Sequence, residues 1–405
     1  MAITNKEQGV WILDEVYNKI NEGDIWAYTG AGGLYSWGYN SNGRLGLNDQ
    51  TQRSSPTQVG TAAYEFVASN SNVVAAIKTD GTLWTWGSDN NGQLMHNTLD
   101  GHLSSPTQVG TDNNWSTFGW AGDTSSLATK TDGTLWACGR NNYGQLGQNQ
   151  YNVSSSSPVQ IPGTWSTAIG SQQGIAAAVT SGGDLFVWGY AEYGMYGNGQ
   201  PSNQHRSSPV QLPSSPAWQN SVNNIAYGYS HTLAMKTNGT MWCTGANTYG
   251  QLGLGGSALD GGTPAAQSSQ ISMVQVGTAT TWNKIDSAQR NSIGTKTDGT
   301  LWTWGRNSFG ELGLNDKIGR SSPTQIPGTD WDTPQMFAIN SFCTKTDGTL
   351  WAWGYNGGGT LGINIGAPES TMSRSSPVQI PGTFWNLEKN QATGYSETVI
   401  LQKDL

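Results

Sequence analysis

Charged residues are scarce in this chain of 405 residues. Asp, Glu, Lys and Arg make up 11% of it, the net charge is -8, and no run of lysines or arginines could follow a phosphate backbone. Nucleic acid is therefore not an expected partner. The N-terminus has no charged stretch followed by an apolar one, and nowhere do about eighteen apolar residues run together. We expect neither a secretory signal nor insertion in a membrane.

Cysteine and histidine are also rare. Cys138, Cys243 and Cys343 are odd in number and far apart, which favours buried thiols over a disulfide framework. None of the four histidines has a partner at metal-ligand spacing, and no GxSxG, Walker or HExxH motif occurs. The sequence thus predicts no catalytic residue, no metal and no cofactor, and the chain is not expected to be an enzyme.

Glycine and tryptophan are abundant instead. The 55 glycines and 19 tryptophans favour tight turns between packed strands over solvated helices. The pattern LWxWGxNxxGxLG recurs seven times, about 50 residues apart, beginning at residues 34, 83, 135, 185, 241, 301 and 350. A repeat of this length is typical of an array of small structural units. We expect an all-β chain.

Each repeat is expected to form four antiparallel strands. A segment led by an aromatic residue is followed by a strand ending in Lys-Thr, a turn of Asp-Gly or Asn-Gly, the LWxWG strand, and a last strand of the type SSPTQV. The turn glycine can take the positive φ that a tight hairpin requires, and the proline suits an edge strand. Seven such units predict a seven-bladed β-propeller of four-stranded antiparallel blades.

We place the propeller at residues 33–405 and a separate lead-in at residues 1–32. The chain enters the propeller with half a repeat and ends with another, residues 385–402, so C-terminal strands are expected to join the first repeat and close the ring. The alternative is that residues 25–28 supply the missing strand. Sixteen tryptophans occupy repeated positions and are assigned to the core.

The lead-in carries a different pattern. Its apolar residues fall at helical spacing and predict a short amphipathic helix, which needs a surface to pack on. We interpret the segment as a candidate attachment element, and the alternative is that it covers the propeller itself. The candidate attachment residues are Trp11, Leu13, Val16, Tyr17 and Ile20.

Two family resemblances follow from these motifs. The signature GTLWxWGxNxxGQLG followed by SSPxQI or SSPxQV resembles the regulator of chromosome condensation repeat family, and the resemblance implies the seven-bladed propeller. The stretch GVWILDEVYNKINEGDIW, residues 9–26, resembles the N-termini of structural proteins from tailed phages, especially those that infect cyanobacteria. The second resemblance implies a virion protein.

Loop length varies most after the LWxWG strand. These loops are expected on one rim of the propeller, and variable loops on one face of a repeat scaffold commonly bind a ligand. Unconstrained drift of surface loops is the alternative. We place Trp120 in a loop of the same rim. The candidate binding residues are His102, Trp120, Tyr151, His205, Asp260 and Glu369.

The sequence therefore predicts a non-catalytic virion structural or tail protein of a tailed phage, assembled in the host cytoplasm. Residues 1–32 would attach to the particle, and the variable rim would bind other virion proteins or the host cell surface. One alternative is a lectin-like propeller that binds glycan. The other is a guanine-nucleotide-exchange regulator like the eukaryotic founder of the repeat family, which the acidic charge and the lack of a basic tail disfavour.

Overall fold

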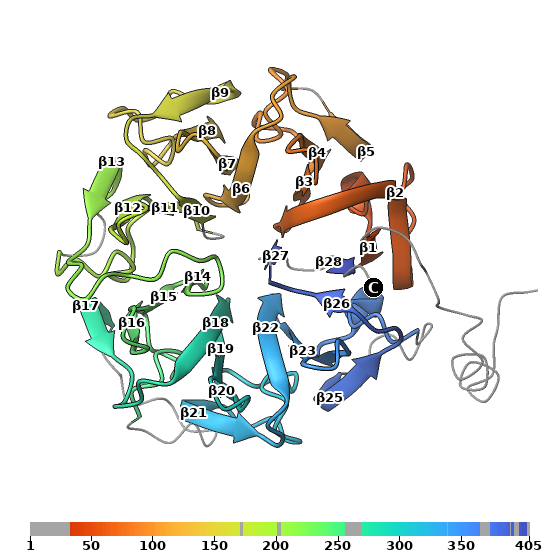
Figure 1. The fold of residues 1–405 in the computed structure, drawn as a ribbon, viewed down its shortest axis with the longest axis vertical. Helices are drawn as coiled ribbons and strands as arrows, with labels where there is room; N and C mark the ends of the chain where they lie inside the picture. Colours follow the sequence, from red (N-terminus) through yellow and green to blue (C-terminus); the bar gives the residue numbers. More distant parts are fainter. Residues whose placement is uncertain are drawn as a thin grey trace, which may run out of the picture.

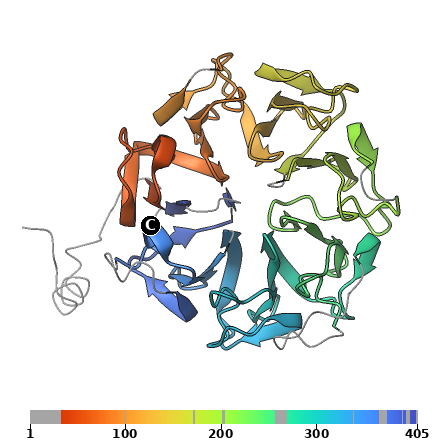
Figure 2. The ribbon, with the colours of Figure 1, turned by 180° about the vertical axis from the view of Figure 1, so that it is seen from behind.

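The computed structural model describes residues 33–402, apart from residues 100, 171–172, 201–203, 256–268, 338, 365–372, 389 and 393–396. Its sheets form a ring around a central axis, seen from opposite sides in Figures 1 and 2. The described residues include two short 3-10 helices, η1 (Ser41–Gly43) and η2 (Gly357–Gly359), and no α-helix. None of their helices is long and apolar enough to cross a membrane. The predicted lead-in helix, with Trp11, Leu13, Val16, Tyr17 and Ile20, lies outside the described residues.

Five sheets are four-stranded, and each is built from strands that follow one another in the chain. All their pairings are antiparallel, as predicted for a propeller. Their strands are β6 (Trp115–Trp120), β7 (Ser125–Lys130), β8 (Leu135–Gly139), β9 (Ser155–Ile161); β10 (Thr167–Gly170), β11 (Ile175–Val179), β12 (Leu185–Gly189), β13 (Arg206–Gln211); β14 (Ile225–Tyr227), β15 (His231–Met235), β16 (Met241–Gly245), β17 (Gln270–Gln275); β18 (Trp282–Ala288), β19 (Asn291–Lys296), β20 (Leu301–Gly305), β21 (Arg320–Ile326); β22 (Trp331–Phe337), β23 (Asn340–Lys345), β24 (Leu350–Gly354) and β25 (Arg374–Ile380).

The sixth sheet has eight strands in the order β26-β28-β1-β2-β3-β4-β5, with β27 beside β2. Its members are β1 (Gly33–Gly38), β2 (Arg53–Ser69), β3 (Val73–Lys78), β4 (Leu83–Ser88), β5 (His102–Gln108), β26 (Trp385–Asn386), β27 (Asn390–Ala392) and β28 (Glu397–Gln402).

The sixth sheet overturns the prediction of seven separate blades, because the described chain forms six sheets. The cause is β2, which runs for 17 residues and pairs with β1 along its first part and with β3 along its second. The link between the first two repeats reads Gly-Thr-Ala-Ala at 60–63. It lacks the Asp and Asn that favour a turn in the corresponding Gly-Thr-Asp-Asn at 110–113, so the strand continues through it.

Strands from both ends of the described chain lie together in this sheet. β28 pairs antiparallel with β1, placing Leu401 opposite Leu34 and Glu397 opposite Gly38. Figure 1 shows the C-terminus beside β1 and β26. The alternative strand, residues 25–28, lies outside the described residues. The ring is held here by a second contact as well, since the Trp37 indole N–H donates to the Thr360 carbonyl at 3.0 Å.

The repeated Lys-Thr-Asp-Gly-Thr sequence forms the hairpin at one end of four tryptophan strands, and Lys-Thr-Asn-Gly-Thr forms it at a fifth. Asp80 Oδ1 accepts hydrogen bonds from the N–H and the hydroxyl of Thr82, whose Oγ1 in turn accepts from the Trp84 indole. Gly81 has a φ of 80°, and a Cβ there would lie 2.0 Å from the Asn113 carbonyl oxygen. The turn therefore requires glycine for both its backbone and its close approach to the next repeat.

A lysine lies between two aromatic rings at five of these turns. Lys296 Nζ, for example, is 3.9 Å from the Trp302 ring centroid and 5.1 Å from that of Trp282. We call the surface formed by these turns the hairpin rim. The five lysines are Lys78, Lys130, Lys236, Lys296 and Lys345.

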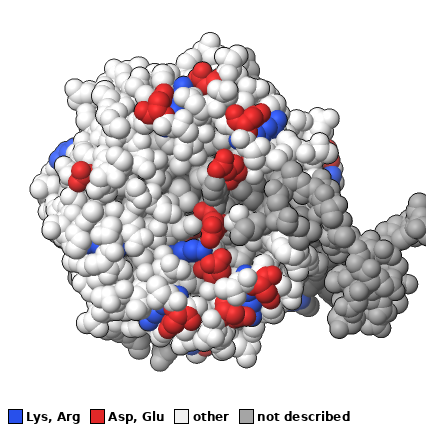
Figure 3. All heavy atoms as spheres, viewed as in Figure 1, with Lys and Arg blue, Asp and Glu red and all other residues white. Residues whose placement is uncertain are grey.

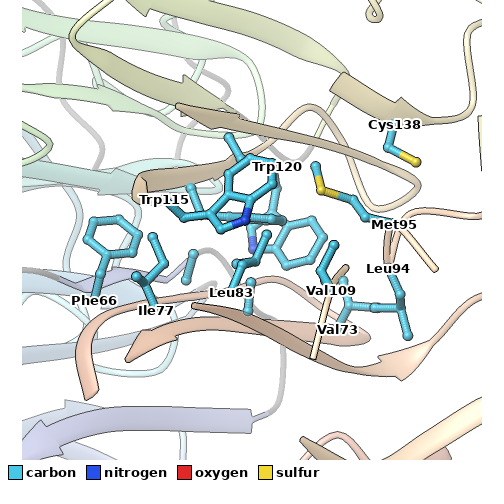
Figure 4. Packing of buried hydrophobic residues seen from close by; sticks show 14 residues of the cluster. Phe66, Val73, Ile77, Leu83, Leu94, Met95, Val109, Trp115, Trp120 and Cys138 are labelled. Carbon is cyan, nitrogen blue, oxygen red and sulfur yellow. The ribbon is translucent and has the colours of Figure 1, made fainter. Parts of the chain in front are cut away.

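The second aromatic of each tryptophan strand joins neighbouring repeats. The Trp304 indole N–H donates to the Gln251 carbonyl at 2.9 Å, and where tryptophan is missing Thr244 donates to the Gly194 carbonyl. Apolar side chains fill the space between adjacent sheets, as Figure 4 shows for β2–β5 and β6–β8. The prediction that the three cysteines are buried free thiols is confirmed.

Candidate functional site

The loops that follow the tryptophan strands form the opposite rim, which we call the loop rim. In most repeats the loop WGxNxxGxL is fixed by its asparagine. Asn307 Oδ1 accepts from the Leu312 N–H at 3.0 Å, and its Nδ2 donates to the Asp316 and Ile318 carbonyls. The same Oδ1 bond recurs at Asn40, Asn141, Asn247 and Asn356, and Asp89 replaces it in the second repeat.

The fourth repeat departs from this pattern because Ala191 stands where the asparagine would be. The Ala191 N–H instead donates to His205 Nδ1 at 3.0 Å. Tyr196 Oη donates to the Gly189 carbonyl at 2.6 Å and accepts from the Arg206 N–H at 3.2 Å. Aromatic side chains and a histidine thus hold this loop in place of the repeated amide.

Five side chains of the third and fourth repeats lie close together on the loop rim, and we call them the aromatic patch. The Tyr143 ring meets the rings of Tyr190 and His205 edge-on, at centroid distances of 4.9 and 4.8 Å. Tyr190 stacks on His205 at 5.2 Å, and Tyr151 Oη donates to the His205 carbonyl at 3.0 Å. Tyr193 completes the patch, because it interacts electrostatically with Tyr190, and it is 44% exposed.

The titratable groups of the patch are tuned by their surroundings. Partial burial lowers the pKa of His205, which the Glu192 carboxylate opposes. A neutral imidazole agrees with Nδ1 accepting the Ala191 N–H, since a protonated ring has no acceptor. Burial and a hydrogen bond with Glu192 raise the pKa of Tyr190 above its ordinary value. Both shifts favour the neutral forms of Tyr190 and His205 near neutral pH.

The sequence predictions for this rim have mixed outcomes. Tyr151 and His205 are brought together by their hydrogen bond. His102 is exposed at the start of β5, opposite Ser88, and takes no part in the contacts of the patch. Asp260 and Glu369 lie outside the described residues.

Trp120 was wrongly placed in a surface loop. It is the last residue of β6, paired with Ser126, and is only 2% exposed. Trp120 shares the inward face of β6 with Phe118, because alternate strand residues point the same way, and the two rings are 4.7 Å apart. Figure 4 shows Trp120 within the core cluster. It is therefore not a candidate binding residue.

Sequence reasoning missed Tyr143, Tyr190 and Tyr193. One signal was present in the motif LFVWGYAEYGMYG, residues 185–197, which replaces the asparagine by Ala191 and the usual leucine by Tyr196. Aligning the seven motifs column by column would have exposed this departure.

No arrangement suited to catalysis stands out among the described residues. They contain no group of three or more His, Cys, Asp or Glu side chains able to hold a metal ion. A perimeter groove of about 480 Å³ between β20–β21 and β22–β25 has Trp331 and Trp351 in its wall. Its lining offers one titratable side chain, Lys345, and no carboxylate. General acid–base chemistry would require a paired group there.

Comparison with known proteins identifies the repeats. Residues 31–76, 132–175, 182–235 and 298–332 match the regulator of chromosome condensation (RCC1) repeat, and residues 222–251 match a second model of that repeat. The human probable E3 ubiquitin-protein ligase HERC4 is 32% identical over 102 residues, which is 25% of this chain and 9% of HERC4. The ultraviolet-B receptor UVR8 of Arabidopsis thaliana is 30% identical over 105 residues, which is 25% of this chain and 21% of UVR8. The chain thus matches only a small part of either relative.

Solved structures with the same fold are similar over nearly their whole length. Human WBSCR16 has a TM-score of 0.75 at 18% identity and covers 93% of this chain, with all of that chain matched. Prp20p of Saccharomyces cerevisiae has a TM-score of 0.72 at 16% identity, covering 96% of this chain and 95% of its own. None of the relatives named here comes from a phage, so a phage origin stays a prediction. The described chain is a β-propeller, and five of its segments match repeats of the regulator of chromosome condensation family.

Proposed function

We propose that this chain is a non-catalytic scaffold that binds another protein through the aromatic patch. The observation that carries the proposal is the gathering of exposed and half-exposed rings where the third repeat meets the fourth, which departs from the common pattern. Scattered surface aromatics need no explanation, but a contiguous cluster is typical of a binding surface. Tyrosine is also enriched at the residues that dominate the energy of protein interfaces.

The relatives give the proposal a precedent. Prp20p has been studied for its binding to Gsp1p and histones, so a propeller of this fold serves as a protein-binding platform. Figure 3 shows acidic and basic side chains on one face of the ring, among a large uncharged area.

Site-specific photo-crosslinking tests this function. A benzophenone amino acid is placed at Tyr193 in the full chain, in the cells that make the protein, and crosslinked proteins are identified by mass spectrometry. Phe384 is the matched control, since it is 39% exposed and lies at the hairpin rim beside Gly348. We expect a defined protein adduct at Tyr193 and none at Phe384. The reverse result, or no adduct at either position, would rule the patch out.

The narrower proposal is that the partner is a virion protein or a host surface protein, and that the chain resides in the virion. It is supported only by the resemblance of residues 9–26 to phage structural proteins. Co-sedimentation of the chain with purified particles, lost when residues 1–24 are deleted, is the expected result. A chain that remains free of particles would refute it.

Glycan binding is a second candidate, because the same exposed tyrosine rings could stack on a sugar. Titration with host-envelope glycans, followed by calorimetry on the chain and on Tyr193→Ala, separates this from protein binding. Heat that is lost in the variant would favour the glycan. Guanine-nucleotide exchange has no observation in its favour beyond the shared fold, and nucleotide-release assays remain its test.

A further inference from the structure

The loop rim itself shows how an arginine binds to one of its rings. The guanidinium carbon of Arg290 lies 4.5 Å from the Tyr249 ring centroid, and its Nη1 donates to Tyr249 Oη at 2.7 Å. In the sixth repeat the guanidinium of Arg306 lies 5.6 Å from the Phe309 centroid. Tyr249 and Phe309 both precede the second glycine of WGxNxxG. The chain thus supplies an arginine to each of these two aromatics.

Tyr143 and Tyr193 occupy the same place in the third and fourth repeats. Arg290 directly precedes Asn291, which pairs with Gly305, the motif glycine of the repeat that follows Tyr249. The residue at the equivalent position is Gly174 in the repeat that follows Tyr143, and Ser230 in the repeat that follows Tyr193. Neither can supply a cation. In the part of the chain that the structure describes, no lysine or arginine lies over a ring of the patch.

The fourth repeat also places an acid at this point. Glu192 stands directly before Tyr193, where the third, fifth and sixth repeats have Asn142, Thr248 and Ser308. Its carboxylate forms a hydrogen bond with Tyr190 and interacts with His205, so it adds negative charge within the patch, in a chain whose net charge is -8. The nearby Arg206 side chain donates to Gln204 Oε1 at 3.0 Å. A planar cation that stacks on a ring and donates to a carboxylate fits this surface.

Tyr193 differs from Tyr249 in its backbone, because it adopts a φ of 54° whereas Tyr249 is not in the left-handed region. A bulky residue in this region carries a local energetic cost, and the exposed ring is retained despite it. Such conformations gather at binding sites. The Tyr249 pair therefore serves as a chemical template for Tyr193 and not as an exact geometric copy.

We infer that the aromatic patch receives an arginine side chain of a partner protein, placed on the Tyr193 ring beside the Glu192 carboxylate. The inference rests on the proposed protein-binding function and names the chemistry of the partner at the same surface. Lysine is the poorer ligand because its ammonium is compact and strongly hydrated, whereas the guanidinium stacks on rings and presents several donors at once.

Two labelled Gly/Ser peptides that differ only in carrying arginines or lysines provide the probe. Fluorescence anisotropy with the full chain measures both affinities at the same salt concentration. We expect the arginine peptide to bind about two- to five-fold more tightly. Tyr193→Leu should abolish this preference and Tyr193→Phe should retain most of it, because the ring remains. Equal affinities in the parent chain, or a preference that survives Tyr193→Leu, would overturn the inference.

Matched variants at the fifth repeat sharpen the test. Tyr249→Leu should leave the preference unchanged, because Arg290 already covers that ring. Arg290→Ala should uncover Tyr249 and raise the stoichiometry of arginine-peptide binding. An unchanged stoichiometry would contradict the use of this pair as the template. Melting temperatures of all variants show whether the propeller remains folded.

The two proposals fail in different ways. A protein adduct at Tyr193 without any preference for arginine peptides would leave the protein-binding function standing and refute the arginine inference. A preference for arginine without any adduct would support the site chemistry and contradict the proposed function. Loss of both would remove the patch as a binding surface.

Discussion

The two rims of the propeller differ in how much of their chemistry is repeated. On the hairpin rim, five turns place a lysine between two aromatic rings in nearly the same way. On the loop rim, the aromatic residues are covered by arginines in the fifth and sixth repeats and open in the third and fourth. Contacts that every repeat shares cannot single out one partner. Repetition therefore indicates a role in folding, and departure from it indicates recognition.

The largest loss of stability is expected from a substitution in the core, which lies between the two rims and supports both. Trp304 is fully buried and its indole donates to the Gln251 carbonyl, so Trp304→Ala should lower the free energy of unfolding by about 3–5 kcal/mol. Urea denaturation measures it. Trp302, half-buried on the same strand, is the control and should lose less. If the free energy of unfolding fell less in Trp304→Ala than in Trp302→Ala, the assignment of Trp304 to the core and of Trp302 to the periphery would be wrong.

Replacing the repeated asparagine should destabilise its loop on the loop rim without changing the aromatic patch. Asn307 is 2% exposed, and its side chain satisfies the Leu312 N–H and two carbonyls. Asn307→Ala should cost about 1–3 kcal/mol, because these buried groups lose their partner. Ser308→Ala, at the exposed neighbouring position, should cost little. If Asn307→Ala left stability unchanged, the amide would not be what fixes the loop.

A single lysine of the hairpin rim should contribute less. Lys296→Met keeps the aliphatic stem and removes the charge between Trp282 and Trp302, for an expected loss of about 0.5–1 kcal/mol. Thermal unfolding at low and high salt measures it. Lys317→Met, at an exposed lysine outside these contacts, is the control. An equal effect of both changes would mean that the ring contacts add no stability.

The smallest effect at neutral pH is expected at the turn itself. Hydrogen bonds from the Thr300 hydroxyl and N–H hold the pKa of Asp298 below its usual value of 3.8. A carboxyl with a lowered folded-state pKa stabilises the fold above its unfolded pKa, and this contribution is lost as the pH falls through the folded value. Asn238 makes the same two bonds. Asp298→Asn should therefore change stability at pH 7 by less than about 0.5 kcal/mol.

Acid titration of the unfolding free energy completes that test. The variant should lose less stability than the parent chain below about pH 4, because it has no carboxylate to protonate there. Identical acid profiles would show that Asp298 contributes no pH dependence to folding.

Much of the fold was predictable because the sequence repeats the residues that determine it. Gly81 and its equivalents predict the hairpins, and the tryptophans of the repeated strand predict the contacts between sheets. The six-sheet arrangement was not predictable from the repeat count, because it depends on two alanines at 62 and 63 allowing β2 to continue. Trp120 was misplaced since the motif does not mark where β6 ends. Tyr151 and His205 of the patch were predicted, but Tyr143, Tyr190 and Tyr193 were missed, because the rings come from two repeats and meet only in the folded ring.

β2 has a mechanical consequence. Neighbouring sheets of the ring are joined by side-chain packing and by single backbone hydrogen bonds, such as that from the Asn97 N–H to the Ser156 carbonyl. β2 instead joins the first repeat to the second by one uninterrupted strand with hydrogen bonds along both of its edges. Force applied at β1 would pass through β2 directly into β3. Separating the first repeat from the second would require breaking the hydrogen bonds between these paired strands, whereas a loop would simply extend. The same sheet contains the seam where β28 meets β1, so the continuous strand lies next to the point at which the ring closes.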